Sequence, residues 1–157
     1  QVGELAAQAI STPGHTPTCM VYHLGDAAFT GDTLFMPDAG TARCDFPDGC
    51  ANQLYASIQR ILALPGETRL FINHDYGAGG NRDMAWETTV SEQRTHNIHV
   101  GNETPEDEYV KIRTEQDDTL AMPRLILPAI QVNIRAGHLP QAEDNGVVYL
   151  KLPLNSF

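Results

Sequence analysis

Three short motifs, each in or just after an apolar run, constrain the fold of this chain most: TPGHT at residues 12–16, TGDTLF at 30–35 and NHDY at 73–76. Each places one possible metal ligand, His15, Asp32 or His74, beside tight-turn residues. A strand that ends in such a turn holds this side chain on stiff backbone at the edge of a sheet. One carboxylate and two imidazoles suit a divalent zinc, iron or manganese ion. The motifs therefore predict a sheet that carries part of a metal site.

The rest of the chain alternates between strand and helix patterns. Strands are expected at residues 5–10, 18–24, 27–30 and 69–72, with a hairpin turn at Gly25-Asp26. Helices are expected at residues 51–64, at 88–95, from an N-cap at Thr104 through Arg113, and in a segment that Pro123 and Pro128 bracket and that runs on to Arg135. A loop rich in Pro, Asp and Gly covers residues 36–49, and the tail at 147–152 is read as a strand or an extended arm. The alternation predicts an α/β layered fold.

Composition excludes several classes of function. The net charge of −10 argues against nucleic-acid binding, which depends on neutralising phosphates with Lys and Arg. No apolar run approaches the length of a membrane-spanning helix, so no membrane partner is expected. Cys19, Cys44 and Cys50 form no CxxC pair, which favours reduced thiols in the cytoplasm. An organelle is the alternative if a targeting segment precedes Gln1.

At the three motifs the chain resembles the metallo-β-lactamase superfamily, in which the His of GHT, the Asp of TGD and the His of HDY follow successive strands. Within this superfamily it is most similar to the persulfide dioxygenases and to bacterial β-lactamase-like hydrolases. Four further segments carry the resemblance: RCDF at residues 43–46, LYASIQRILALPGET at 54–68, TTVSEQRTHN at 88–97 and LPAIQVNIRAG at 127–137. The resemblance implies an α/β chain that forms the C-terminal half of a metallo-β-lactamase-type αββα sandwich.

The resemblance also implies a chemistry. Persulfide dioxygenases oxidise glutathione persulfide to sulfite and glutathione in sulfide detoxification, and they use one iron(II) ion; zinc is the alternative metal. By this resemblance His15 and Asp32 are two ligands of the metal. His74 and Tyr76 would lie close to the reaction without binding iron, and the location would be a bacterial cytoplasm.

One feature of the family is absent from these 157 residues. Persulfide dioxygenases carry an HxHxDH motif upstream of the GHT histidine, and its first His supplies the third iron ligand. We therefore expect residues 1–157 to be a single incomplete domain without the N-terminal half of the sandwich. Its partners would be that missing half or a second copy of the chain, besides a small molecule like glutathione persulfide. The chain alone would be inactive.

Two other functions are open. A thioester hydrolase of the glyoxalase II type would keep the fold, bind two zinc or iron ions bridged by Asp32, and use His74 as a ligand. A truncated, non-catalytic domain would instead act through oligomerisation, because half a sandwich exposes the face that its other half should cover.

Several side chains near the motifs have two interpretations. Arg43 is the candidate for gripping a carboxylate of the substrate in a bidentate fork, and the alternative is an ion pair with Asp45. Asp75 either orients a neighbouring group or caps its turn. Tyr76 either places its hydroxyl on substrate or water, or packs as an aromatic ring with a solvated tip.

The remaining polar residues are expected to have ordinary roles. Cys44 could approach the site but is not expected to bind metal. The acidic stretch at residues 103–118 is read as a solvated helix face. The histidines without a motif are expected at the surface or at caps: His23, His96, His99 and His138.

Overall fold

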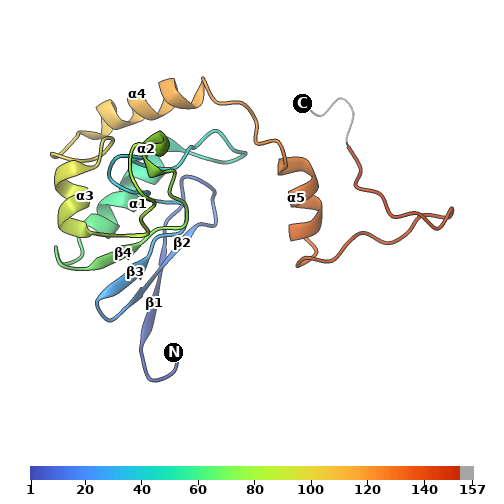
Figure 1. The fold of residues 1–157 in the computed structure, drawn as a ribbon, viewed down its shortest axis with the longest axis horizontal. Coiled ribbons are helices and arrows are strands. Elements are labelled where there is room, and N and C mark those ends of the chain that lie inside the picture. The colour runs from blue at the N-terminus through green and yellow to red at the C-terminus, as the bar shows by residue number, and fades with distance from the viewer. Residues whose placement is uncertain (153–157) are drawn as a thin grey trace. The chain divides into compact units, whose positions relative to one another are not determined.

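The computed structural model describes residues 1–152 of the chain, and Figure 1 shows its ribbon. It divides into two compact units, Gln1–Thr119 and Leu120–Phe157. The first unit holds the sheet and the three motifs, and the second holds one helix and a long arm. An α/β class with a mixed sheet is confirmed. Whether residues 1–157 act as one domain stays a prediction.

The first unit is built on a five-stranded sheet in the order β1-β2-β3-β4-β5. Its strands are β1 (Ala7–Ser11), β2 (Met20–Leu24), β3 (Ala27–Phe29), β4 (Arg69–Phe71) and β5 (Glu87–Thr89). The expected hairpin is confirmed, because Leu24 pairs with Ala27 across Gly25-Asp26. Strands β3 and β4 are parallel, while the other neighbouring pairs are antiparallel. Strands β1, β3 and β4 therefore run in one direction, and their carboxyl ends meet at one edge.

One face of this sheet is buried beneath helices. Val21, Ala28 and Leu70 are fully buried on it. They belong to one apolar core with the inward residues of helix α1 (Ala51–Leu62), which are Leu54, Ile58 and Ile61. Because these α1 residues recur at helical spacing, one stripe of the helix can cover the sheet, as the sequence predicted.

The opposite face of the sheet is not covered in this way. Tyr22, Phe29 and Phe71 occupy adjacent positions on β2, β3 and β4. Tyr22 is 51% exposed and Phe29 is 46% exposed. The rings of Phe29 and Phe71 stack with centroids 5.3 Å apart. We call these three residues the aromatic sheet face.

The other helices of the first unit are short or polar. Helix α3 (Val90–His96) starts at a capping box in which Thr89 and Glu92 exchange hydrogen bonds. Helix α4 (Glu106–Asp117) has Pro105 at its N-cap, so the predicted cap at Thr104 is one residue early. The four-residue α2 (Gly77–Gly80) follows the NHDY motif.

Two expectations about polar residues in this unit were wrong. His99 is not a surface residue: it is 4% exposed, and its Nδ1 accepts a hydrogen bond from the Thr41 amide. The acidic stretch is not wholly solvated, because Asp117 is 8% exposed and pairs with the buried Arg113. His99 binds the loop at residues 36–49 at Thr41, and Asp117 binds the same loop at the Cys44 amide. Propensity and periodicity alone could not show this, because Thr41 and Cys44 lie far from these partners along the chain.

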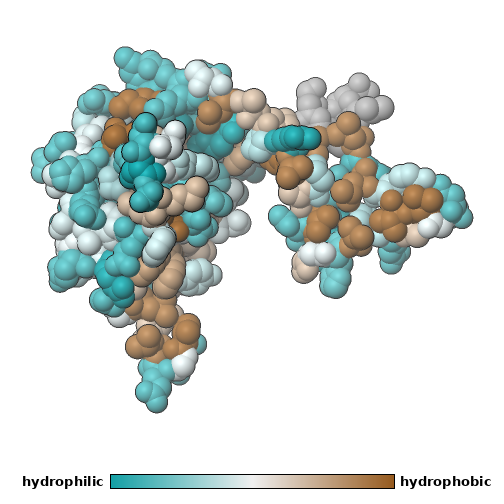
Figure 2. All heavy atoms as spheres, in the orientation of Figure 1, coloured by the Kyte–Doolittle hydropathy of each residue, from teal (hydrophilic) through white to brown (hydrophobic). Residues whose placement is uncertain are grey.

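The second unit contains helix α5 (Ile126–Asn133) and an arm that, within residues 120–152, forms no strand. Pro128 does not precede α5 but lies in its first turn. A helix tolerates a proline at this position, because the first backbone N–H groups have no partner within the helix. Figure 2 shows apolar residues gathered over this unit. The exposed ones include Leu125, Ile130, Ile134, Leu139, Val147 and Leu152.

Among residues 1–152, no helix is long and apolar enough to cross a membrane.

Candidate metal centre

The sheet topology explains why the three motifs meet. His15 follows β1, Asp32 follows β3 and His74 follows β4, and all three strands end at the same edge. Asp32 and His74 each lie three residues beyond the paired Phe29 and Phe71 of two parallel strands. A fixed offset after parallel partners places the two side chains next to each other. The structure thus brings together the three residues that the sequence singled out.

His15 is fixed by a hydrogen bond on the side of its ring away from Asp32. Its Nδ1 donates to the carbonyl oxygen of Arg43 at 2.7 Å. The Phe46 ring packs against the imidazole edge-on, with centroids 5.1 Å apart. A proton held on Nδ1 leaves the lone pair on Nε2, the nitrogen that faces Asp32 at 3.9 Å.

Asp32 lies between the two imidazoles. Its Oδ2 is 3.9 Å from Nε2 of His15, and its Oδ1 is 3.1 Å from Nε2 of His74. Oδ1 is nevertheless buried without a properly aligned hydrogen-bond partner among residues 1–152. An orphaned carboxylate oxygen is costly unless something compensates its charge, and a cation would do so.

These donors fit part of a metal coordination shell. Two imidazole nitrogens and a carboxylate are the ligand types of zinc and non-haem iron sites. Within residues 1–152, however, no three His, Cys, Asp or Glu side chains converge as a complete metal-holding group. His15 and Asp32 are suited to be two ligands, and a full shell needs a further donor or a rearrangement of His74.

The structure shows the ion pair with Asp45 that was one of the two interpretations of Arg43. Its guanidinium holds Asp45 in a two-pronged contact and lies over the Phe46 ring at 5.1 Å. The Asp45 carboxylate raises the pKa of Arg43, and Arg43 lowers the pKa of Asp45. A role in substrate binding stays a prediction, and it would require the fork to open.

Cys44 is a buried, free thiol. Burial, followed by the nearby charge of Asp117, raises its pKa to about 12. A thiol that resists deprotonation is a poor metal ligand.

The residues after His74 form one side of a shallow hollow. Residues 72–76 and 84–86 line a space of about 330 Å³ beside the imidazole. Tyr76 is 63% exposed there, and its ring meets the edge of Phe35. The hydroxyl of Tyr76 is therefore open to solvent or to a bound molecule.

Both interpretations of Asp75 agree with the structure, because its carboxylate orients Arg82 and also accepts a hydrogen bond from the Gly77 backbone in its own turn. Its carboxylate accepts hydrogen bonds from Arg82 and from the Ala85 amide, and Arg82 also binds Asp38. These bonds hold the pKa of Asp75 well below its usual range. Sequence reasoning missed Arg82 and Asp38, which tie the loop at residues 36–49 to the segment after His74; the only available signal was an arginine between two acidic neighbourhoods.

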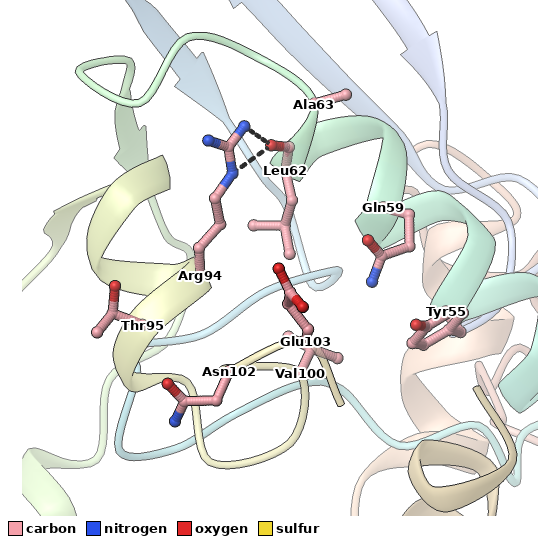
Figure 3. A pocket seen from close by; sticks show the side chains of 9 residues that line it. All are labelled: Tyr55, Gln59, Leu62, Ala63, Arg94, Thr95, Val100, Asn102 and Glu103. Atoms are coloured by element: carbon pink, nitrogen blue, oxygen red, sulfur yellow. Dashed lines mark hydrogen bonds between the residues drawn. The ribbon is translucent and has the colours of Figure 1, made fainter. Parts of the chain in front are cut away.

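A second hollow lies on another side of the first unit. It measures about 700 Å³ and lies between α1, α3 and residues 100–103, as Figure 3 shows. Arg94 points across it but donates to the carbonyls of Leu62 and Leu64 at the end of α1. This hollow contains no candidate metal ligand from the three motifs.

Comparisons with known proteins agree with this geometry. The family model described as "Metallo-beta-lactamase superfamily" matches residues 2–74, the stretch that contains all three candidate ligands. A protein named "Glyoxylase B2" from Dictyostelium discoideum is 52% identical over 98% of this chain and 53% of its own length. The mitochondrial persulfide dioxygenase ETHE1 of Bos taurus is 36% identical over 87% of this chain and 50% of its own length.

A solved structure gives the same result. The crystal structure of ETHE1 from Myxococcus xanthus superimposes with a TM-score of 0.77 at 37% identity, over 88% of this chain and 57% of that one. The chain thus spans about half the length of these relatives. Its motifs, its mixed sheet and these similarities show that the chain belongs to the metallo-beta-lactamase superfamily.

Proposed function

We propose that this chain supplies His15 and Asp32 to the mononuclear iron(II) site of a persulfide dioxygenase. The observation that carries the proposal is the arrangement around Asp32. Its buried Oδ1 lacks a hydrogen bond, and the bond to the Arg43 carbonyl leaves the lone pair of His15 on Nε2, which faces Oδ2 of the same carboxylate at 3.9 Å. Similarity to a protein named persulfide dioxygenase supports this activity, and the iron is what the resemblance to that family implies.

The reaction would convert glutathione persulfide, O2 and water to glutathione and sulfite. When bound, iron(II) would supply open coordination positions for a persulfide and O2 and the redox chemistry of the oxidation. The chain's own residues hold and orient the substrate. The hollow beside His74 has exposed apolar walls at Tyr76, Met84 and Trp86, where the carbon chain of a glutathione-like molecule can lie. The exposed Tyr76 hydroxyl can donate a hydrogen bond to a polar group of the same molecule.

A complete metal site needs a further ligand besides those that residues 1–152 bring together. The Dictyostelium discoideum and Bos taurus relatives are about twice as long as the aligned stretch, and the aromatic sheet face is exposed. We propose that an N-terminal half of the sandwich covers this face and adds the missing ligand. The free cysteines fit a reducing compartment such as the cytoplasm.

The second candidate is a two-metal thioester hydrolase. The specific observation in its favour is the separation of 3.1 Å between His74 Nε2 and Asp32 Oδ1, which suits an aspartate shared between two metal positions. A relative named "Glyoxylase B2" adds to this candidate.

Metal counting separates the candidates. The native protein would be isolated, weighed intact and analysed for metals by plasma mass spectrometry, as wild type and as His74→Ala. About one iron per site in both proteins, with O2 consumption by the wild type on glutathione persulfide, supports the dioxygenase. Two metals, one of them lost in His74→Ala, with hydrolysis of a glutathione thioester, supports the hydrolase. A mass of 17.2 kDa with no metal would contradict both.

A further inference from the structure

A single peptide group connects His15 to a buried ion pair on helix α4. The carbonyl oxygen of the Arg43–Cys44 peptide accepts the Nδ1 proton of His15 at 2.7 Å. The amide of the same peptide group donates to Oδ2 of Asp117 at 2.8 Å. The two hydrogen bonds thus lie at opposite ends of one planar, resonance-coupled unit.

Asp117 is itself held in place on its other oxygen. Arg113 Nε donates to Oδ1 at 3.0 Å, and Nη2 lies 2.8 Å from the same atom. Arg113 Nη1 also donates to the carbonyl of Thr41 at 3.1 Å, two residues before Arg43. The side chains of Arg113 and Asp117 are 5% and 8% exposed. The Arg113–Asp117 pair therefore binds the loop at Thr41 and at Cys44, on both sides of Arg43, whose carbonyl binds His15.

Stability alone is a weak reason for such a pair. Taking two charges out of water costs several kcal/mol, and replacing a buried ion pair by apolar residues is often neutral or stabilising. A pair of this kind is better explained if it fixes one geometry. Here the pair fixes the direction of the Arg43 backbone carbonyl, which accepts the hydrogen bond from His15.

The electrostatic effect of the pair has a definite direction. A carboxylate that accepts from the Cys44 amide draws the peptide's positive end toward itself and makes the Arg43 oxygen a stronger acceptor. A stronger acceptor holds the His15 proton on Nδ1 and increases the electron density at Nε2. Hydrogen-bonded partners of this kind tune metal-binding histidines and their loss costs about 10- to 100-fold in affinity.

We propose that Asp117, supported by Arg113, is a positioning residue for the metal site and acts on His15 through the Arg43–Cys44 peptide. The inference rests on the proposed role of His15 as a ligand. It deepens that proposal, because it assigns a function to two α4 residues that lie more than 70 positions from the loop residues they bind.

The test compares three variants of the chain. Asp117→Asn removes the charge and keeps the shape. The double variant Arg113→Leu/Asp117→Leu removes the ion pair without leaving an unpaired buried charge, so it remains informative if Asp117→Asn does not fold. The matched control is Tyr109→Phe, which deletes a buried hydrogen bond from α4 to the Thr41 hydroxyl and leaves the Arg43–Cys44 peptide untouched.

Two measurements are made on each variant. The first is Co²⁺ affinity from the visible absorption of the bound ion, with His15→Ala as the reference for loss of the site. The second is the ¹⁵N chemical shifts of the His15 ring without metal, which report the tautomer. We expect both α4 variants to bind Co²⁺ about tenfold more weakly and to shift the ring away from the pure Nδ1–H form, while Tyr109→Phe changes neither.

The outcomes separate this inference from the proposed function. Two results would overturn the role of Asp117. One is that the His15 ring shifts of both α4 variants equal those of wild type; the other is that Tyr109→Phe changes these shifts as much as the α4 variants do. Equal Co²⁺ binding by wild type and His15→Ala would instead overturn His15 as a ligand. The tautomer measurement would still decide whether Asp117 positions the ring.

Discussion

Gly14 lies against the backbone of Leu54, so that a Cβ atom at Gly14 would lie 2.3 Å from the Leu54 Cα. Its φ of +143° also lies where side chains are strained. We expect Gly14→Ala to lower the free energy of unfolding by about 3 kcal/mol or more, because helix α1 or the turn that carries His15 must move. Urea unfolding measures this loss.

The control is Gly25→Ala in the β2–β3 turn. Gly25 also has a positive φ, of +59°, but no atom lies within 4 Å of an added Cβ. This variant should lose about 1 kcal/mol, the cost of the backbone conformation alone. Equal losses in the two variants would show that the contact with Leu54 is unimportant.

His99 makes stability depend on pH. Burial, with the nearby Arg113 charge, lowers the pKa of His99 from 6.5 to about 4. Between these values the unfolded chain binds the proton and the folded chain does not. The contribution is therefore complete above pH 6.5 and is lost as the pH falls toward 4, by roughly 3 kcal/mol in all.

His99→Asn provides the comparison, because its Oδ1 takes the position of Nδ1 as acceptor for the Thr41 amide and it cannot titrate in this range. Denaturant unfolding between pH 4 and pH 7 should give a shallower decline for His99→Asn than for wild type. Parallel curves for the two proteins would count against a buried neutral His99.

Arg82 should be needed for the order of the segment after His74. It binds Asp75 and Asp38 together, and a lysine cannot span two carboxylates with a planar fork. We expect Arg82→Lys to lower the urea midpoint and to speed amide exchange at residues 73–86. Arg69→Lys, at the exposed pair with Asp26, should change the midpoint less; the reverse order would refute a special role for Arg82.

The aromatic sheet face should mediate association with the proposed N-terminal half. Phe29→Glu places a charge at its centre and should weaken co-purification with that half, or self-association, as measured by sedimentation. The control Gln53→Glu adds the same charge at an exposed position of helix α1 and should not change association. Unchanged association in Phe29→Glu would show that the partner binds elsewhere. Dimers of the chain that Phe29→Glu dissociates would point to a second copy.

Cys44 should resist alkylation. Its pKa of about 12 keeps the thiol protonated at pH 8, whereas Cys19 and Cys50 are partly accessible. Iodoacetamide treatment of the native protein, followed by peptide mass spectrometry, should label Cys19 and Cys50 before Cys44. Asp117→Asn removes a charge that raises this pKa, so it should quicken the labelling of Cys44; faster labelling of Cys44 than of Cys50 in wild type would contradict its burial.

The sequence by itself determined most of the elements and the identity of the candidate ligands, but it did not predict strand β5, which occupies the start of the helix expected at residues 88–95. The apolar stripe of Leu54, Ile58 and Ile61 predicted α1, and the turns around His15 and Asp32 predicted strand ends. These are local properties, because periodicity and turn chemistry depend on residues only a few positions apart. The errors of one residue at the start of α4 and of a few residues at strand ends are of the kind that local signals leave.

Only the tertiary structure decided which distant groups meet. The parallel pairing of β3 with β4 places Asp32 beside His74, and the loop at residues 36–49 turns the Arg43 carbonyl to His15. Asp117 looked like one more acid on a solvated helix until the fold buried it beneath that loop. Such contacts join residues tens of positions apart, and no local pattern encodes them because their energy comes from burial and hydrogen bonding that exist only once the chain is folded.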